Sequence, residues 1–302
     1  MIVTVTPNPA LDVSYRVDKL APGTTHRVRS VRERAGGKGF NVSRVLHELG
    51  VATLAIGPVG GVLGESIRAD LLAAGIRHAL LAVDAPTRMT VAVVDEEDAT
   101  LFNEAGAALL DTEWDRLLDL VRARLVGADV VVCSGSLPLG SPRDTCARIV
   151  GIARDAGIPV VVDTSGPALL AAAQAGADVV KPNAAELREV VDADDPVAGA
   201  EALRAAGAGA VVLSSGPDGM VAVTGEGRWR AIPPFPVRGN PTGAGDAAVA
   251  ALANGLVEQS SWPMRLRAAV AWSAAAVAAP VAGSVDLALL HRLYEEVAVE
   301  AF

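Results

Sequence analysis

Short apolar runs rich in valine recur along the chain, and longer segments with helical periodicity separate them. The apolar runs lie at residues 2–5, 53–59, 128–133, 158–163, 177–182 and 210–215. The helical patterns include residues 39–50, 65–75, 112–127 and 141–157. Continuous apolar strands that alternate with helices are typical of a parallel sheet buried on both faces. We therefore predict an α/β fold with a mostly parallel, doubly wound sheet.

Two segments break this rhythm because polar and apolar residues alternate along them. They are residues 12–34 and 87–104, and the second contains a predicted turn at Asp95–Asp98. Alternation of this kind is typical of half-exposed antiparallel strands. We expect the two segments to form one small β layer that covers an edge of the main sheet, although two unrelated surface hairpins would give the same pattern.

The composition narrows the class of protein. The 302 residues carry a net charge of −9, whereas nucleic-acid-binding proteins usually present a basic face, so no nucleic-acid partner is expected. Cys133 and Cys146 lack CxxC spacing and are predicted to be buried, reduced thiols. The histidines are scattered without HExxH spacing, so a histidine-based metal site is not expected.

Neither a signal peptide nor a membrane span is expected. Residues 1–9 lack a basic region and are predicted to begin the first strand. The apolar residues 268–283 are rich in alanine and are interrupted by Ser273 and Pro280, which predicts a buried helix rather than a span. We therefore expect a cytoplasmic protein without membrane contact.

The most informative segment is GNPTGAGDAAVAALANG, residues 239–255, in which glycines and one carboxylate precede an alanine-rich helix. Gly243 and Gly245 permit a tight turn, and the amides at the start of the helix favour an anion such as phosphate. Phosphate repels a carboxylate, so Asp246 is a candidate base that takes a proton from an attacking hydroxyl. An ordinary helix N-cap is the alternative interpretation.

A second glycine-rich segment, RAGGKGFNVSRVLHELG at residues 34–50, also opens a helix. Three glycines surround Lys38, and Asn41 lies on the first turn. The cation and the free amides favour a phosphorylated or polyhydroxyl ligand. The segment matches neither a Walker A loop nor a GxGxxG dinucleotide turn. A glycine-rich helix start with a solvated lysine is the alternative interpretation.

Three further polar segments lie near the ends of predicted strands, where ligands of open α/β sheets bind. They are TPNPALD at 6–12, KPNAAEL at 181–187 and SSGPDG at 214–219. Asp12 ends the first, and Asn183 and Glu186 in the second share one helix face. A Pro-Asn turn, a helix cap and a hairpin would explain each segment alone, so the prediction depends on their common placement.

The order of these motifs resembles that of the ribokinase-like sugar kinases of the phosphofructokinase B type. The resemblance runs from residue 2 to about residue 284, through NPALD, GGKGFNVSRVL, SGSLP, KPNAAEL, SSGPDG and TGAGDA. NPALD and GGKGFNVSRVL are similar to the 1-phosphofructokinase and tagatose-6-phosphate kinase branch. The resemblance implies one domain over residues 1–302, a three-layer α/β/α sandwich with a small β-sheet lid formed by about 12–34 and 87–105.

The resemblance also implies roles for individual residues. Asp246 would be the catalytic base, beside an anion hole formed by Gly243, Ala244 and Gly245. Arg88 would contact the phosphate that the substrate already carries, and the sugar would contact Asp12, Gly37, Lys38 and Asn41. Glu186 would organise Mg²⁺ through water, and the nucleotide would contact Lys181, Asn183, Glu186, Ser214, Ser215, Gly216 and Gly219.

The implied activity is that of an ATP-dependent, Mg²⁺-requiring kinase that converts fructose 1-phosphate to fructose 1,6-bisphosphate. The chain departs from the branch at GNPTGAGDA and at TRMTVAV (87–93), which leaves the acceptor open. Tagatose 6-phosphate, fructose 6-phosphate and an unphosphorylated ketohexose are alternative acceptors. A non-catalytic sugar- or nucleotide-binding regulator is a more distant alternative. Exposed lid edges can pair between subunits, which also predicts a homodimer through the lid.

Overall fold

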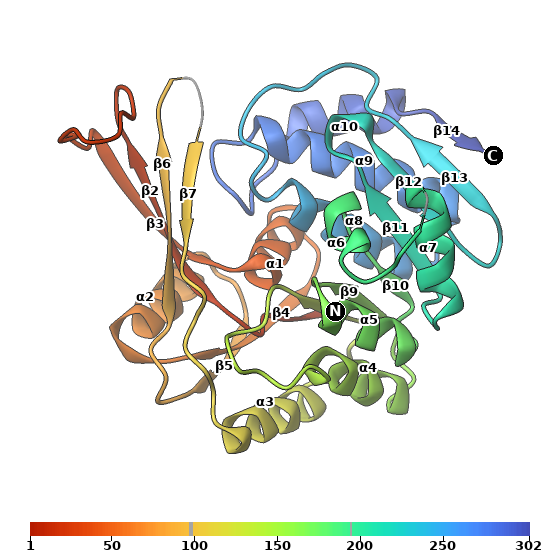
Figure 1. Cartoon of the computed structure of the whole chain (residues 1–302), viewed down its shortest axis with the longest axis horizontal. Helices are drawn as coiled ribbons and strands as arrows, with labels where there is room; N and C mark the ends of the chain where they lie inside the picture. Colours follow the sequence, from red (N-terminus) through yellow and green to blue (C-terminus); the bar gives the residue numbers. More distant parts are fainter. Residues whose placement is uncertain (97–98, 194) are drawn as a thin grey trace.

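The structure, a computed structural model, describes residues 1–96, 99–193 and 195–302, and these residues form two β-sheets with flanking helices (Figure 1). The large sheet has the strand order β14-β13-β12-β11-β10-β9-β8-β1-β4-β5. Its strands are β1 (Ile2–Val5), β4 (Thr53–Val59), β5 (His78–Ala82), β8 (Val130–Ser134), β9 (Val160–Asp163), β10 (Val179–Val180), β11 (Ala210–Ser214), β12 (Met220–Val223), β13 (Arg228–Ala231) and β14 (Val299–Ala301). From β5 to β11 all pairs are parallel, whereas β12, β13 and β14 are antiparallel at one edge. The mostly parallel sheet confirms the predicted α/β fold.

Helices cover both faces of the large sheet and bury its valine-rich strands. One face carries α1 (Lys38–Glu48), α8 (Ala244–Val257), α9 (Trp262–Ala278) and α10 (Leu287–Glu296). The opposite face carries α3 (Asp111–Ala123), α4 (Thr145–Asp155), α5 (Pro167–Gln174), α6 (Ala184–Arg188) and α7 (Pro196–Ala205). Val130 and Val131 are neighbours on β8, yet each is fully buried in a different one of the two hydrophobic clusters. Because β8 is buried on both faces, its sequence does not alternate between polar and apolar residues.

A separate small sheet has the strand order β3-β2-β6-β7 and lies to one side of the large sheet (Figure 1). Its strands are β2 (Ala10–Arg16), β3 (Ser30–Gly36), β6 (Arg88–Val94) and β7 (Ala99–Asn103). A parallel pairing of β2 with β6 joins two antiparallel pairs into one sheet. This confirms one small β layer rather than two unrelated hairpins. The assignment of residues 1–302 to a single domain stays a prediction.

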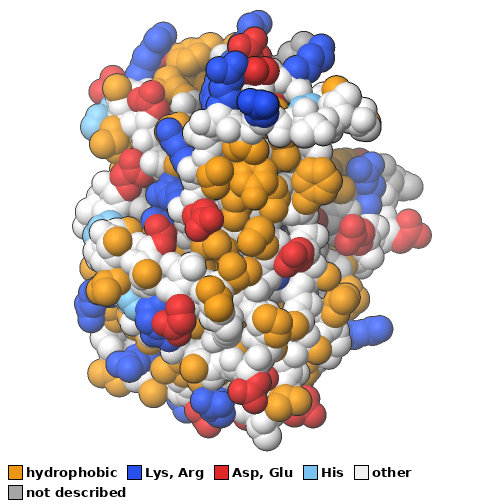
Figure 2. Space-filling model, turned by 90° about the vertical axis from the view of Figure 1, so that its left-hand side faces the viewer, with side chains coloured by type: hydrophobic (Ala, Val, Ile, Leu, Met, Phe, Trp, Pro, Cys, Tyr) orange, Lys and Arg blue, Asp and Glu red, His pale blue; other side chains and the backbone are white. Residues whose placement is uncertain are grey.

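The small sheet has one largely apolar face. At its inner end this face packs against α2 (Gly61–Ala73) in a cluster that includes Leu11 and Ile67. Farther out, the alternation of side chains puts Val31 and Phe102 on the same face, where they are 53% and 57% exposed. Figure 2 looks onto this side of the molecule and shows hydrophobic side chains gathered near its middle.

Several strand boundaries differ from the sequence-based predictions. Residues 17–29 form no strand, so the predicted lid segment 12–34 contains two strands separated by a loop. The strand expected at 177–182 is shorter, because β10 covers only Val179–Val180, and beyond Lys181 the residue Pro182 has no N–H with which to continue the pairing. Of the predicted turn at Asp95–Asp98, residues 97–98 lie outside the described residues.

The ends of the helices follow local chemistry. Gly50, Gly75 and Gly157 have positive φ directly after a helix, as predicted for C′ glycines. α9 ends before Pro280, and Ala279 has the extended conformation expected of a residue that precedes proline (φ −73°, ψ 149°). Within the described ranges, no helix combines the length and the apolar character that crossing a membrane requires.

The two cysteines are free and buried, as predicted. Cys133 lies on β8 and Cys146 on α4, with 3.7 Å between their sulfur atoms. The hydrogen bond to Cys146 and then burial raise the pKa of Cys133 well above its usual value, so this thiol is neutral. Both side chains therefore act as small apolar groups of the core.

Candidate active site

The residues predicted to form the anion hole lie at the start of α8. Gly243 precedes this helix with φ 88°, in the left-handed region that favours glycine. Two hydrogen bonds fix the turn before it: the Thr242 N–H donates to Asn240 Oδ1 (2.9 Å), and the Ala244 N–H donates to the Pro241 carbonyl oxygen (3.1 Å). First-turn amides have no partner inside a helix and carry the positive end of its dipole. The Gly243 and Gly245 amides therefore fit an anion, whereas the Ala244 amide of the predicted anion hole already donates to Pro241.

Asp246 follows in the first turn of α8, and its side chain is buried. Asn41 of α1 donates from Nδ2 to Asp246 Oδ2 at 2.8 Å. Burial raises the pKa of Asp246 to about 7, and the charge of Asp163 adds to this, while Lys38, Asn41 and Lys181 oppose it. A carboxyl group with this pKa can accept and release a proton near neutral pH.

Asp163 connects the two lysines of the site and is a residue that the sequence analysis missed. Its carboxylate is 1% exposed and lies 3.3 Å from both Lys38 Nζ and Lys181 Nζ. Burial opposes its ionisation, but the two lysines outweigh burial and hold the pKa of Asp163 below its usual value. The signal was present in the sequence, because Asp163 ends a buried strand at the sheet edge where α/β proteins bind ligands.

Lys38 begins α1 directly after Gly37, which has φ 97° and so requires glycine. Its ammonium group lies 3.3 Å from Asp163 and 3.7 Å from Glu186 Oε1. The charge of Asp163 is the main cause that raises the pKa of Lys38, and Glu186 and Asp246 contribute. Lys38 therefore stays positively charged in this cluster, and its contact with the sugar stays a prediction.

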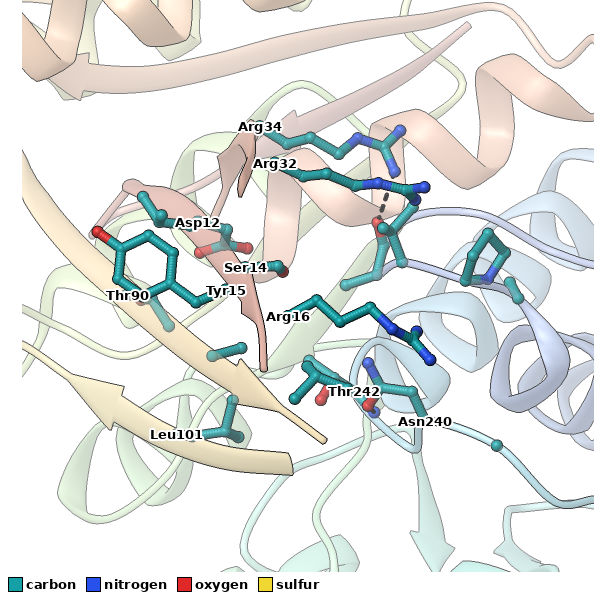
Figure 3. Close-up of a pocket in the computed structure, with 18 of the residues that line it drawn as sticks. Asp12, Ser14, Tyr15, Arg16, Arg32, Arg34, Thr90, Leu101, Asn240 and Thr242 are labelled. Atoms are coloured by element: carbon teal, nitrogen blue, oxygen red, sulfur yellow. Dashed lines mark hydrogen bonds between the residues drawn. The ribbon is translucent and has the colours of Figure 1, made fainter. Parts of the chain in front are cut away.

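Asp12 and Asn41 line a cavity of about 390 Å³ between the small sheet, the loop at 239–242 and residues 277–282 at and after the end of α9 (Figure 3). Burial raises the pKa of Asp12 to about 6, against the opposing effects of Arg88 and Thr90. The Asp12 carboxylate lies over Gly36, where an added Cβ would come within 2.0–2.3 Å of the carboxyl atoms. The Asp12 carboxylate can therefore occupy this position because residue 36 has no side chain.

Arg88 lies on β6, and its side chain is directed to backbone oxygens. Its Nε and Nη2 donate to the Asn8 carbonyl at 3.4 and 3.3 Å, and its Nη1 donates to the Glu104 carbonyl at 2.6 Å. A guanidinium has five N–H donors, so two remain for another partner. Arg88 lines a narrow recess with Asn8 and Gly106, and its charge acts on the Asp12 carboxyl group.

Three arginines that the sequence analysis did not assign face the larger cavity. Arg16, Arg32 and Arg34 extend from β2 and β3 toward the opposite loops in Figure 3. Arg32 and Arg34 are two residues apart on one strand, and this spacing puts both side chains on one face of a sheet. The spacing was visible in the sequence, but the pairing with β2 that brings Arg16 beside them was not.

The predicted nucleotide residues gather at the ends of β10 and β11. Asn183 Oδ1 accepts hydrogen bonds from the Ala185 and Glu186 amides (2.8 and 2.9 Å), and Glu186 Oε2 accepts one from the Asn183 amide (2.8 Å). This capping box fixes the start of α6 beside Ser214, which is bridged to Asn183. Lys181 lies just before it and is paired with Asp163.

A second cavity, of about 690 Å³, begins at the turn after β11. The Ser215 amide donates to the Gly219 carbonyl oxygen (2.9 Å), and Gly216 and Gly219 have φ of 58° and 81°. These two glycines line the cavity with the proline-rich residues 232–236. Its apolar walls suit a flat heterocyclic base. Gly239 and Val277 line both this cavity and the one that contains Asp12, so the two cavities adjoin.

The carboxylates here suit a Mg²⁺ ion held mainly by phosphates and water. Among the residues that the structure describes, no three acidic, histidine or cysteine side chains form a metal-binding group. Mg²⁺ in phosphoryl-transfer sites usually takes one or two carboxylates and keeps several waters. Glu186 is the carboxylate that fits, because its side chain is partly exposed and its Oε1 faces the lysine cluster.

Comparison with known proteins shows the family of this chain. Residues 8–287 match the family described as pfkB family carbohydrate kinase. The chain belongs to the PfkB family of carbohydrate kinases. As a member, it is an ATP-dependent sugar kinase, and sugar kinases of this family generally use ATP with Mg²⁺.

Solved structures of PfkB-type kinases superimpose along almost the whole chain. Phosphofructokinase-2 from Escherichia coli gives a TM-score of 0.90 at 31% identity, over 97% of this chain and 98% of that chain. The same E. coli enzyme in complex with fructose-6-phosphate gives 0.88 at 32% identity, again over 97% and 98%. A possible 1-phosphofructokinase from Thermotoga maritima gives 0.87 at 27% identity, over 100% and 99%.

Proposed function

We propose that this PfkB-family kinase transfers the γ-phosphoryl group of ATP to a ketohexose phosphate, with fructose 1-phosphate as the preferred acceptor. The observation that carries the proposal is the environment of Asp246, a buried carboxylate held by Asn41 at 2.8 Å in the first turn of α8. Asn41 lines the cavity that contains Asp12, and Ala244, two residues before Asp246, lines the second cavity. Asp246 is therefore next to both substrates in this proposal.

In the proposed reaction, Asp246 accepts the proton of the sugar hydroxyl while the hydroxyl oxygen bonds to the γ-phosphorus. The bond from that phosphorus to the bridging oxygen breaks, and ADP leaves with the electron pair. The amides of Gly243 and Gly245 stabilise the oxygens of the transferring group, while the Ala244 amide holds the turn through Pro241. Lys38 and Lys181 add positive charge, and the contact with Asp163 holds both lysines in place.

The remaining predicted residues bind the two substrates in this proposal. Asp12 accepts hydrogen bonds from sugar hydroxyls, and Gly37 lets the backbone approach the sugar. Glu186 holds Mg²⁺ through water, and the bound ion neutralises phosphate charge. The turn from Ser214 to Gly219 borders the base and ribose of ATP. We also place the enzyme in the cytoplasm, where both substrates would be available.

Support for an acceptor that already carries phosphate comes from three sources. The E. coli relative was solved with fructose-6-phosphate, and the T. maritima relative is described as a possible 1-phosphofructokinase. The NPALD and GGKGFNVSRVL motifs resemble the 1-phosphofructokinase and tagatose-6-phosphate kinase branch. Arg88 keeps two N–H donors for a phosphate, and its charge is close enough to Asp12 to lower the pKa of that carboxyl group.

The proposal is tested by measuring ADP release with a panel of acceptors. Fructose 1-phosphate, fructose 6-phosphate, tagatose 6-phosphate and free fructose are compared at saturating ATP, and kcat/KM is determined for each. We expect the highest kcat/KM with fructose 1-phosphate. A higher value with another member of the panel would replace the proposed acceptor, and no turnover with any of them would reject the proposed reaction.

A further inference from the structure

The positive charges of the catalytic centre are already balanced by acidic groups. Lys38 and Lys181 both contact Asp163, and Lys38 also lies near Glu186. Asp246 adds a further acidic group beside them. ATP and a sugar phosphate both bring negative charge into this region. Cations that no carboxylate neutralises must therefore lie elsewhere in the cleft if they are to bind phosphate.

Such cations lie on the cavity-facing side of the small sheet. The register pairs Asp12 with Arg34, Ser14 with Arg32 and Arg16 with Ser30, so all of these side chains alternate onto one face. Arg16, Arg32 and Arg34 line the cavity of about 390 Å³, and Asp12 is the one acidic residue among the described residues that line it. This wall carries an excess of positive charge in a chain whose net charge is −9.

The hydrogen bonds of these arginines leave most of their donors available. Arg34 Nη1 donates to the Ala282 carbonyl oxygen at 3.2 Å, which connects β3 with the loop after α9. Within residues 1–96, 99–193 and 195–302, the side chains of Arg16 and Arg32 have neither a hydrogen bond nor an ion pair. Figure 3 shows both side chains reaching across the cavity, Arg16 toward Asn240. Guanidinium groups that line one cavity and form no ion pair favour a phosphate ligand.

We propose that Arg16, Arg32 and Arg34 form a second phosphate-binding subsite, on the small sheet and within the cavity that contains Asp12 and Asn41. The subsite binds a phosphate group of one substrate, either the phosphate of the acceptor or the terminal phosphates of ATP. The proposal rests on the proposed function, because that reaction brings both ligands into this cleft. It adds a contact that is distinct from Arg88, which faces a different recess.

The test compares ligand binding by the wild type and the double variant Arg16→Ala/Arg32→Ala. Arg34 stays unchanged because it connects the small sheet to Ala282. Arg29→Ala is the matched control, since Arg29 is an exposed arginine of the same segment that pairs with Asp18. Calorimetry on the full-length protein measures the Kd of ATP and of fructose 1-phosphate separately. The double variant should bind one of the two about tenfold more weakly or worse, because charge-assisted hydrogen bonds to phosphate are lost.

The pattern of the losses decides the outcome. A loss confined to fructose 1-phosphate assigns the subsite to the acceptor, and a loss confined to ATP assigns it to the nucleotide. Equal losses for both ligands, or none for either, would contradict the proposal, as would an equal loss in Arg29→Ala. If the wild type neither binds nor phosphorylates fructose 1-phosphate, the proposed acceptor fails, whereas the ATP titration still decides the subsite. In that case, unchanged ATP binding in the double variant would overturn the proposed arginine subsite.

Discussion

The surroundings of the buried Asp246 side chain shift its pKa in opposite directions. Burial, the largest influence, favours the neutral acid and raises its pKa to about 7, together with the charge of Asp163. Lys38, the Asn41 amide and Lys181 favour the carboxylate. Only the carboxylate can accept a proton from the sugar hydroxyl. The balance of these influences therefore sets the pH range in which the proposed base is active.

We expect kcat/KM to fall on acidification, because protonation removes the base. Below pH about 7 the loss should approach about tenfold per pH unit, as for a single essential carboxylate. The variant Asn41→Leu lacks a hydrogen bond that lowers this pKa, so its acidic limb should move to higher pH. Profiles of kcat/KM against pH for both proteins check the prediction. A wild-type profile without an acidic limb would contradict it.

At the scale of elements, sugar binding depends on how closely β2 and the end of β3 approach. The Asp12 carboxylate occupies the space over Gly36 that a side chain would fill. The strand end cannot retreat easily, because Arg44 is paired with Asp70, and Asp70 Oδ2 accepts a hydrogen bond from the Ala35 amide at 2.7 Å. These contacts join α1, α2 and β3 at the turn that carries the sugar site.

The variant Gly36→Ala should therefore displace Asp12 from its position. We expect the KM for the sugar to rise by about tenfold to hundredfold, as for other small misplacements of binding groups, with little change in the KM for ATP. Gly151→Ala is the control, because a Cβ added there, on α4, meets no atom within 4 Å. Steady-state kinetics on both variants measure the effect. An unchanged sugar KM in Gly36→Ala would mean that Asp12 does not hold the sugar.

At the scale of the whole molecule, the outer face of the small sheet is suited to pairing with a second copy. Val31 and Phe102 are 53% and 57% exposed on this face, and β3 and β7 are the edges of the small sheet. Exposed apolar patches and strand edges are typical of interaction surfaces. The relatives include a tetrameric inhibited form of E. coli phosphofructokinase-2. A homodimer through the small sheet stays our prediction for this chain.

Light scattering during size-exclusion chromatography tests the dimer. The wild type should have twice the monomer mass of 30.7 kDa. Val31→Asp puts a charge on the patch and should give a monomer, since an unpaired charge is costly to bury. Val126→Asp is the control, because Val126 is 90% exposed and lies outside the small sheet. A monomeric wild type, or a dimer that survives Val31→Asp, would count against this interface.

Features that depend on residues close together in the sequence could be predicted, whereas contacts between distant segments could not. The apolar run at 53–59 forms a strand with those bounds, and the glycines after three helices adopt positive φ, because each pattern is local. The capping box of Asn183 and Glu186 is local as well. In contrast, the contacts of Asp163 with two lysines join three segments that are far apart in the sequence. The placement of Arg16 and Arg32 on one face depends on strand register, which single-sequence patterns do not give.

The central claim is that Asp246 takes the proton of the sugar hydroxyl during phosphoryl transfer. The most direct measurement is kcat for Asp246→Asn with the acceptor that the wild type turns over fastest, together with the Kd for ATP. We predict a loss in kcat of about hundredfold or more, because asparagine cannot accept the proton, with ATP binding unchanged. Wild-type kcat in this variant would contradict the account.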